Sequence, residues 1–181
     1  MAVSLFTSRV VLQTLGVEDY GISSVVGGVI TLFSFINGGM VSSTQRYLNF
    51  EIAKGNAERL RSVFNTALQI HTLIALLIII LGETIGLWFL LEKLVIPEER
   101  MTAAMWVYQC SIIACAVNIL SVPYNADIIA HEKMSAFAYI SILDVTLKLV
   151  IVYLLVVSPI DKLIAFAILT LLVQLLIRYV Y

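Results

Sequence analysis

The hydrophobic and polar positions of this chain alternate over lengths that match the thickness of a lipid bilayer. No Asp, Glu, Lys or Arg occurs between Tyr20 and Gln45, and similar uncharged stretches run from 62 to 82 and from 101 to 126. A membrane-spanning helix needs about 20 mostly apolar residues to cross a hydrocarbon core about 30 Å thick. The pattern therefore predicts an integral membrane protein built from several spanning helices.

The polar interruptions between these stretches predict where the helices begin and end. Gly16 and the Lys54-Gly55-Asn56 sequence fall at predicted turns. Pro97 and Pro159 precede acidic residues, as is typical of a helix start. We therefore expect an all-α, polytopic transmembrane helix bundle of about six segments. Four are expected to be complete and the first and last partial: 1–13 (partial), 20–45, 62–91, 101–130, 134–157 and 163–181 (possibly partial).

Composition supports the membrane assignment and limits the partners. Hydrophobic residues make up 61% of the chain and charged residues 13%, against about 25% in ordinary soluble domains. The net charge of −1 argues against nucleic acid as a partner, because binding phosphates requires a concentrated basic surface. Cys110 and Cys115 lie within one apolar segment, so no disulfide framework is expected. Membrane lipids are the expected partners, and no cofactor is indicated.

The basic residues indicate an orientation. Arg46, Lys54, Arg59 and Arg61 lie between the second and third segments, whereas the predicted turn at 15–20 has no Lys or Arg. Basic loops stay in the cytoplasm. We therefore expect 46–61 to be cytoplasmic and 17–20 to be external. Arg9 interrupts the first apolar stretch, so no cleavable signal peptide is expected.

The N-terminal part offers one candidate cation and one polar helix face. Arg9 is flanked by apolar residues and needs protein, water or an anion around it, although it could instead extend to a lipid headgroup. Its planar guanidinium suits a phosphate. Ser24, Gly28 and Thr31 lie on one face of the second segment. That face favours either close helix packing or the lining of a cavity.

The fifth segment carries two charges. Asp144 and Lys148 are four residues apart, which predicts an intrahelical ion pair, with a coupling role in ion or proton transfer as the alternative. His71 is expected to be a hydrogen-bonded packing residue. No metal-ligand spacing and no nucleophile with a matching base occur, so the sequence predicts neither a metal site nor an enzyme.

Several short sequences resemble one transporter family. They are SRVVLQTLGVEDYG at 8–21, VGGV at 26–29, STQRYL at 43–48 and PYNADIIAHEKM at 123–134. These resemble the N-terminal part of Wzx-type flippases, which are bacterial polysaccharide exporters of the multidrug/oligosaccharidyl-lipid/polysaccharide superfamily. The resemblance implies 12 to 14 helices in two lobes around a cavity. Residues 1–181 would then be most of a truncated first lobe.

The resemblance also implies a cargo. Members move undecaprenyl-pyrophosphate-linked oligosaccharides across the bacterial inner (cytoplasmic) membrane by alternating access, for surface polysaccharides such as O-antigen lipopolysaccharide. Polysaccharide assembly proteins would be partners. Basic residues in the cavity meet the pyrophosphate, a role that Arg9 fits best and Arg46 less well.

Other functions stay open. A multidrug/cation antiporter of the same superfamily would need an acid in the cavity, for which Asp144 is the candidate. A membrane polymerase or ligase would need a large external loop, which the chain lacks between its predicted spans. A truncated membrane protein without transport activity is the third alternative.

Overall fold

The described structure consists of helices and the short turns that join them. A computed structural model describes residues 2–157 and 161–181, and within these it leaves out the side chains of 2–6, 29–38 and 157. No strand occurs in these ranges, which confirms the predicted all-α bundle. The elements are α1 (Ala2–Lys54), α2 (Ala57–Leu81), the π-helical turn η1 (Gly82–Gly86), α3 (Leu87–Glu92), α4 (Glu98–Ala130), α5 (Met134–Val157) and α6 (Lys162–Val180).

Among the described residues, four helical stretches are long and apolar enough to cross a membrane. The protein is therefore a multi-pass membrane protein. The last of the four was expected to be partial, but its 19 residues reach the length of a span. The predicted span 20–45 lies within α1, where the side chains of 29–38 are outside the description, so it stays a prediction. The four stretches are Ala57–Glu92, Glu98–Ala130, Met134–Val156 and Lys162–Val180.

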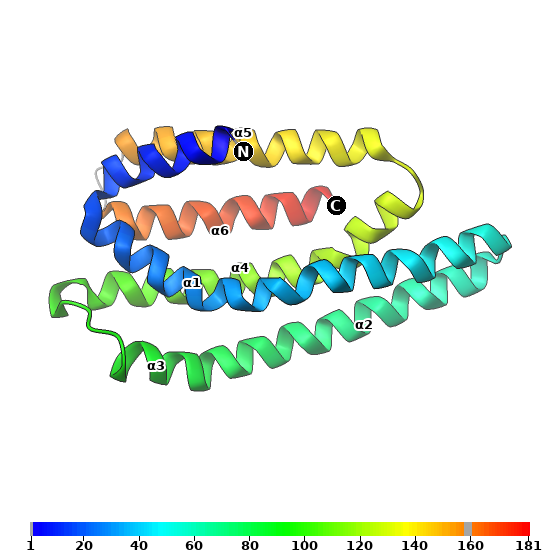
Figure 1. Cartoon of the computed structure of the whole chain (residues 1–181), viewed down its shortest axis with the longest axis horizontal. Coiled ribbons are helices and arrows are strands. Elements are labelled where there is room, and N and C mark those ends of the chain that lie inside the picture. The colour runs from blue at the N-terminus through cyan, green and yellow to red at the C-terminus, as the bar shows by residue number, and fades with distance from the viewer. Residues whose placement is uncertain (1, 158–160) are drawn as a thin grey trace.

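The first helix reverses direction at one glycine (Figure 1). Gly16 has φ 86° and ψ 169°, a backbone conformation that is essentially restricted to glycine. Residues 17–20, expected to form a turn, are instead helical and begin the long second part of α1. The reversal lets Val11 and Leu15 of the short first part join the main hydrophobic core.

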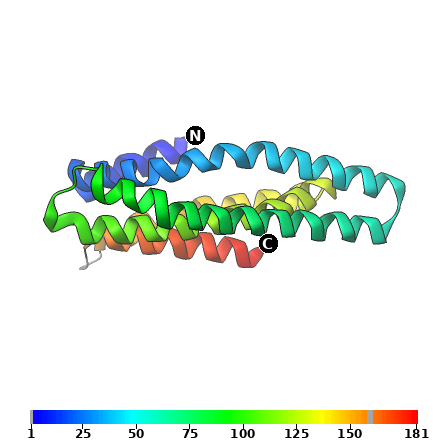
Figure 2. The ribbon, with the colours of Figure 1, turned by 90° about the horizontal axis from the view of Figure 1, so that it is seen from below.

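The α1–α2 hairpin is longer than the rest of the bundle. It turns at Gly55 and Asn56, where the Asn56 side chain accepts a hydrogen bond from the Arg59 backbone N–H at 3.0 Å. The hairpin projects past the α4–α5 turn (Figures 1 and 2). Residues 46–61 were predicted as a loop, but all of them except Gly55 and Asn56 are helical. The prediction was wrong because both helices continue beyond the length that a bilayer requires.

Helix α4 is the centre of the bundle and contacts α1, α2, α5 and α6. Small buried residues such as Ala104, Cys110 and Ala116 let the neighbouring helices approach closely. The π-helical turn fits against the same helix: the hydroxyl of Tyr108 donates to the carbonyl of Gly82 at 2.6 Å. A Cβ atom on Gly86 would collide with that hydroxyl.

Charged residues join three helices at the end of the bundle that contains the Gly16 reversal. Arg100 of α4 places Nε 3.2 Å from Asp19 Oδ1 and a terminal guanidinium nitrogen 2.8 Å from Asp161 Oδ2. Asp161 also caps α6 by accepting from the Leu163 N–H at 3.0 Å. The three residues form the Asp19–Arg100–Asp161 cluster. It fixes the α1 reversal relative to the starts of α4 and α6.

Candidate functional site

A polar cavity of about 400 Å³ lies between α4, α5 and α6, with Val41 of α1 at its edge. Each of the three helices contributes residues spaced i, i+3 and i+7, which places them on one face. Most of the residues on these faces are polar, which is unusual inside a membrane protein and marks a candidate functional site. The lining residues are Asn118, Ser121, Val122 and Asn125 on α4, Ile140, Ser141, Asp144 and Lys148 on α5, and Gln174, Ile177 and Tyr181 at the end of α6.

The two charges of the cavity neutralise each other. Lys148 Nζ lies 2.7 Å from Asp144 Oδ2, so the expected ion pair is present. Asp144 lies ten residues after the first residue of α5, about 15 Å along the helix and near the middle of the span. Pairing makes two charges tolerable at such a depth. The pair faces the cavity, so it also supplies donors and acceptors to whatever enters.

The amides and hydroxyls of the cavity have unused hydrogen-bonding capacity. The oxygen Oδ1 of Asn125 is buried without a hydrogen-bond partner among the described residues. Ser121 and Ser141 donate to carbonyls of their own helices, at 2.8 Å each, and keep their hydroxyl lone pairs. The cavity therefore presents oxygen acceptors and amide donors without net charge.

Aromatic and basic side chains lie beside the cavity at the α6 end. The guanidinium of Arg178 stacks 3.9 Å from the centre of the Tyr124 ring, and Phe64 meets the same ring edge-on with centroids 5.3 Å apart. These contacts connect α6, α4 and α2. They hold the last turn of α6, and with it Gln174 and Ile177, against the bundle.

The N-terminal candidates lie apart from this cavity. Arg9 is exposed, whereas Val11 and Leu15 of the same helical arm are buried. Ser24 is exposed and Gly28 half-buried, and neither of them lines the polar cavity. The side chain of Thr31 lies outside the described residues. The structure thus brings Asp144 and Lys148 together, but it does not bring Arg9, Ser24 or Gly28 to them.

Arg46 lines a separate surface depression on α1. Its neighbours there are Ser43, Tyr47, Asn49 and Phe50. The depression is near the α1–α2 turn, as expected for a residue at the predicted cytoplasmic end. Arg46 is exposed and available to an anionic group at that surface.

Other ionisable residues show no catalytic arrangement in the described ranges. His131 and Asp127 form an exposed pair at 3.3 Å, and Gln109 donates to Glu83 at 3.2 Å. No group of three or more His, Cys, Asp or Glu side chains that could hold a metal occurs among the residues described.

Sequence reasoning identified Asp144 and Lys148 but missed the amides that accompany them. Asn118, Asn125 and Gln174 are scattered in the sequence and lie on three-, four- or seven-residue spacings with other polar residues. That spacing was a usable signal within each helix. The convergence of the three faces on one cavity is a tertiary feature.

Comparison with protein-family models, curated proteins and solved structures gave no match.

Proposed function

We propose that this protein takes part in moving a lipid-linked oligosaccharide across a membrane, as a flippase of the kind its sequence resembles. The observation that carries the proposal is the polar, electrically neutral cavity at membrane depth. A purely structural bundle has no need for three converging polar faces, because each buried polar group costs free energy in a lipid environment.

The lining chemistry matches a sugar. Sugar hydroxyls both donate and accept hydrogen bonds, and the side chains of Asn118, Asn125 and Gln174 do the same. Tyr181 adds an aromatic ring at the edge of the cavity. An organic cation would instead need an unpaired acid, and Asp144 is already paired with Lys148 at 2.7 Å. The cavity thus favours an oligosaccharide over the cationic drug of an antiporter.

The pyrophosphate of such a cargo needs a cation outside the neutral cavity. Arg9 and Arg46 are both exposed, and neither has its guanidinium committed to an ion pair among the described residues. A guanidinium binds phosphate oxygens through two parallel hydrogen bonds. In this proposal Arg46 meets the pyrophosphate at the predicted cytoplasmic surface and Arg9 holds it during passage. The cargo is an undecaprenyl-pyrophosphate-linked unit, the membrane is the bacterial inner membrane, and polysaccharide assembly proteins supply or take up the cargo.

Substitutions at the native locus, followed by measurement of surface glycan, test the proposal. Gln174→Leu removes an amide from the cavity and should lower export, whereas Gln69→Leu, at an exposed position of α2, should not. Arg9→Ala should lower export, and Arg9→Lys should retain part of it, because the charge remains but the paired hydrogen bonds are lost. Protein abundance in the membrane is measured in parallel.

The alternatives give different results. Export at the parental level in both Gln174→Leu and Arg9→Ala would contradict the proposal. Loss of drug resistance in Asp144→Asn, with surface glycan unchanged, would indicate the antiporter instead.

A further inference from the structure

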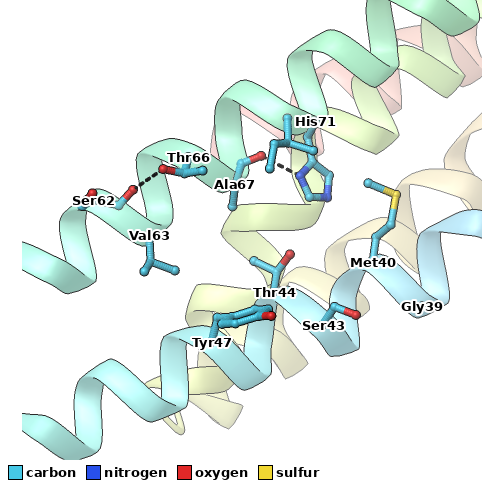
Figure 3. A pocket seen from close by; sticks show the side chains of 11 residues that line it. Gly39, Met40, Ser43, Thr44, Tyr47, Ser62, Val63, Thr66, Ala67 and His71 are labelled. Carbon is cyan, nitrogen blue, oxygen red and sulfur yellow. Dashed lines mark hydrogen bonds between the residues drawn. The ribbon is translucent and has the colours of Figure 1, made fainter.

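A second cavity, the α1–α2 groove, separates the two long helices of the hairpin. It has a volume of about 650 Å³ and a lining distinct from that of the polar cavity. The lining combines apolar side chains, including Met40 and Val63, with the hydroxyls of Ser43 and Thr66 (Figure 3). Ile70 also lines the groove. Ile70 and Tyr47 are more than half exposed, so the groove is open along its length.

One buried histidine points into this groove with an unused acceptor. His71 is 3% exposed, and its Nδ1 lies 2.7 Å from the carbonyl oxygen of Ala67 (Figure 3). A carbonyl only accepts, so Nδ1 carries the proton, and in this tautomer Nε2 is the acceptor. Nε2 is buried and has no hydrogen-bond partner among the described residues. Leaving a buried acceptor unpaired is unfavourable, so the site is complete only when something donates to Nε2.

The position of the groove limits what that donor is. His71 belongs to the stretch Ala57–Glu92, which has the length and composition of a membrane span. His71 lies inside the uncharged stretch 62–82, ten residues after Arg61 and twelve before Glu83, and the exposed side chains of Ile70 and Tyr47 leave the groove beside it open. An occupant therefore arrives from the lipid phase, with an apolar surface for the lining residues and an O–H or N–H group for Nε2.

We propose that the α1–α2 groove binds a hydroxyl-bearing membrane lipid, whose chain lies against Met40, Val63 and Ile70 and whose O–H donates to His71 Nε2. The hydrocarbon chain of a polyprenyl pyrophosphate has no O–H or N–H and by itself would leave Nε2 unpaired. The groove and the polar cavity share no lining residue, so they are separate sites. The proposal does not rest on the protein being a flippase.

Photolabelling in lipid nanodiscs tests it with two matched probes. One probe is a diazirine-bearing long-chain alcohol and the other is its methyl ether, which has the same chain but no donor. The alcohol should label peptides of α1 and α2 that border the groove. The ether should label them about two- to tenfold more weakly, the effect expected from loss of one hydrogen bond.

Two histidine variants test whether His71 causes the difference in labelling between the alcohol and the ether. His71→Phe keeps a ring but removes the acceptor, so the alcohol should lose its advantage over the ether. His131→Phe is the matched control, because His131 also places Nδ1 against the carbonyl four residues earlier, at 3.0 Å, but is exposed and outside the groove. Gln174→Leu should leave labelling unchanged, which separates this site from the transport cavity.

A spectroscopic measurement covers the case in which His71→Phe does not fold. In the parent protein, the ¹⁵N resonance of His71 Nε2 should shift on addition of the alcohol and not of the ether. Equal labelling by the two probes, absence of labelling in the groove, or an unchanged Nε2 resonance would each overturn the proposal. Protection of the groove by a second protein segment would appear as absence of labelling.

Discussion

Two groups of charged side chains in this bundle make short contacts with opposite charges. Asp144 and Lys148 meet at mid-span, and Asp19, Arg100 and Asp161 meet at the end of the bundle. In each case a partner of opposite charge offsets part of the cost of removing a charge from water. Substitution of one partner should therefore differ from substitution of both.

Asp144 and Lys148 should behave as a coupled pair. Asp144→Asn or Lys148→Met alone leaves an unpaired charge in the cavity, whereas the double variant leaves none. Both side chains are partly exposed to the cavity, so we expect a coupling free energy of about 1 kcal/mol, toward the lower end for contacting residues. Thermal unfolding of the four proteins in detergent measures it. If the destabilisation of the double variant equals the sum of the two single effects, the charges act independently.

Asp19 should make stability depend on pH. Burial raises the pKa of Asp19 above its ordinary value of 3.8, Arg100 opposes this effect, and the carboxylates of Asp161 and Glu18 add to it. The pKa of Asp19 is thus higher in the folded protein than in the unfolded chain. At pH values between the two, the folded protein binds more protons, so the contribution of Asp19 to the free energy of unfolding falls as the pH rises. Asp19→Asn removes the titration and should give a flatter profile of melting temperature upward from about pH 4. A variant profile as steep as that of the parent would assign the dependence to other groups.

Among the helices, α1 depends on a single residue for its shape. Gly16 allows the short arm to fold back, so that Val11 and Leu15 belong to the same hydrophobic core as Val152 and Leu155. The other helices contact one another without the arm: α4 contacts α2, α5 and α6, and α5 contacts α6. Alteration of Gly16 should therefore disturb the position of the arm and leave the rest of the bundle in place.

Gly16→Ala should destabilise the protein by about 1–3 kcal/mol, because an L side chain is strained at φ 86° and ψ 169°. Gly21→Ala is the matched control: it is helical, and a Cβ there meets no atom within 4 Å. Thermal unfolding measures the stability of each variant. The accessibility of the thiol in a Val11→Cys background reports the position of the arm. Similar behaviour of both alanine variants would show that the backbone at Gly16 is not strained.

The two ends of the whole bundle differ in charge. Acidic residues outnumber basic ones where the Gly16 reversal and the starts of α4 and α6 meet. At the opposite end, basic residues outnumber Glu51, Glu58, Asp127 and Glu132; they are Arg46, Lys54, Arg59, Arg61, Lys133 and Arg178. Because cytoplasmic loops are enriched in Lys and Arg, this asymmetry predicts that the hairpin end is cytoplasmic.

Single-cysteine labelling tests that orientation in a background lacking Cys110 and Cys115. Glu18→Cys should react with an impermeant maleimide in intact cells, and Asn56→Cys should react only after the membrane is permeabilised. The reverse pattern would show that the hairpin end is external. Both substituted side chains are exposed, so a difference in labelling reports the side of the membrane and not burial.

Several features followed directly from the sequence. Uncharged stretches of bilayer length predicted the helical fold, and the Asp144–Lys148 spacing predicted the ion pair, because both depend on local geometry: 1.5 Å of rise per residue and 3.6 residues per turn. The sequence also predicted that the chain reverses direction near Gly16. It did not predict that the reversal is confined to that one residue. The resemblance to oligosaccharide flippases and the roles assigned to Arg9 and Arg46 stay predictions.

Tertiary structure alone decided which polar residues meet. The sequence contains Asn118, Asn125 and Gln174 without indicating that their faces converge, because helix rotation is set by packing of the apolar faces around α4. In the same way, His71 was expected to be a satisfied packing residue, and half of that expectation holds: Nδ1 is bonded to its own helix, which local geometry ensures. Nε2 is left unpaired because its surroundings come from α1, whose approach to α2 is set by the long hairpin and not by any residue adjacent to His71 in the chain.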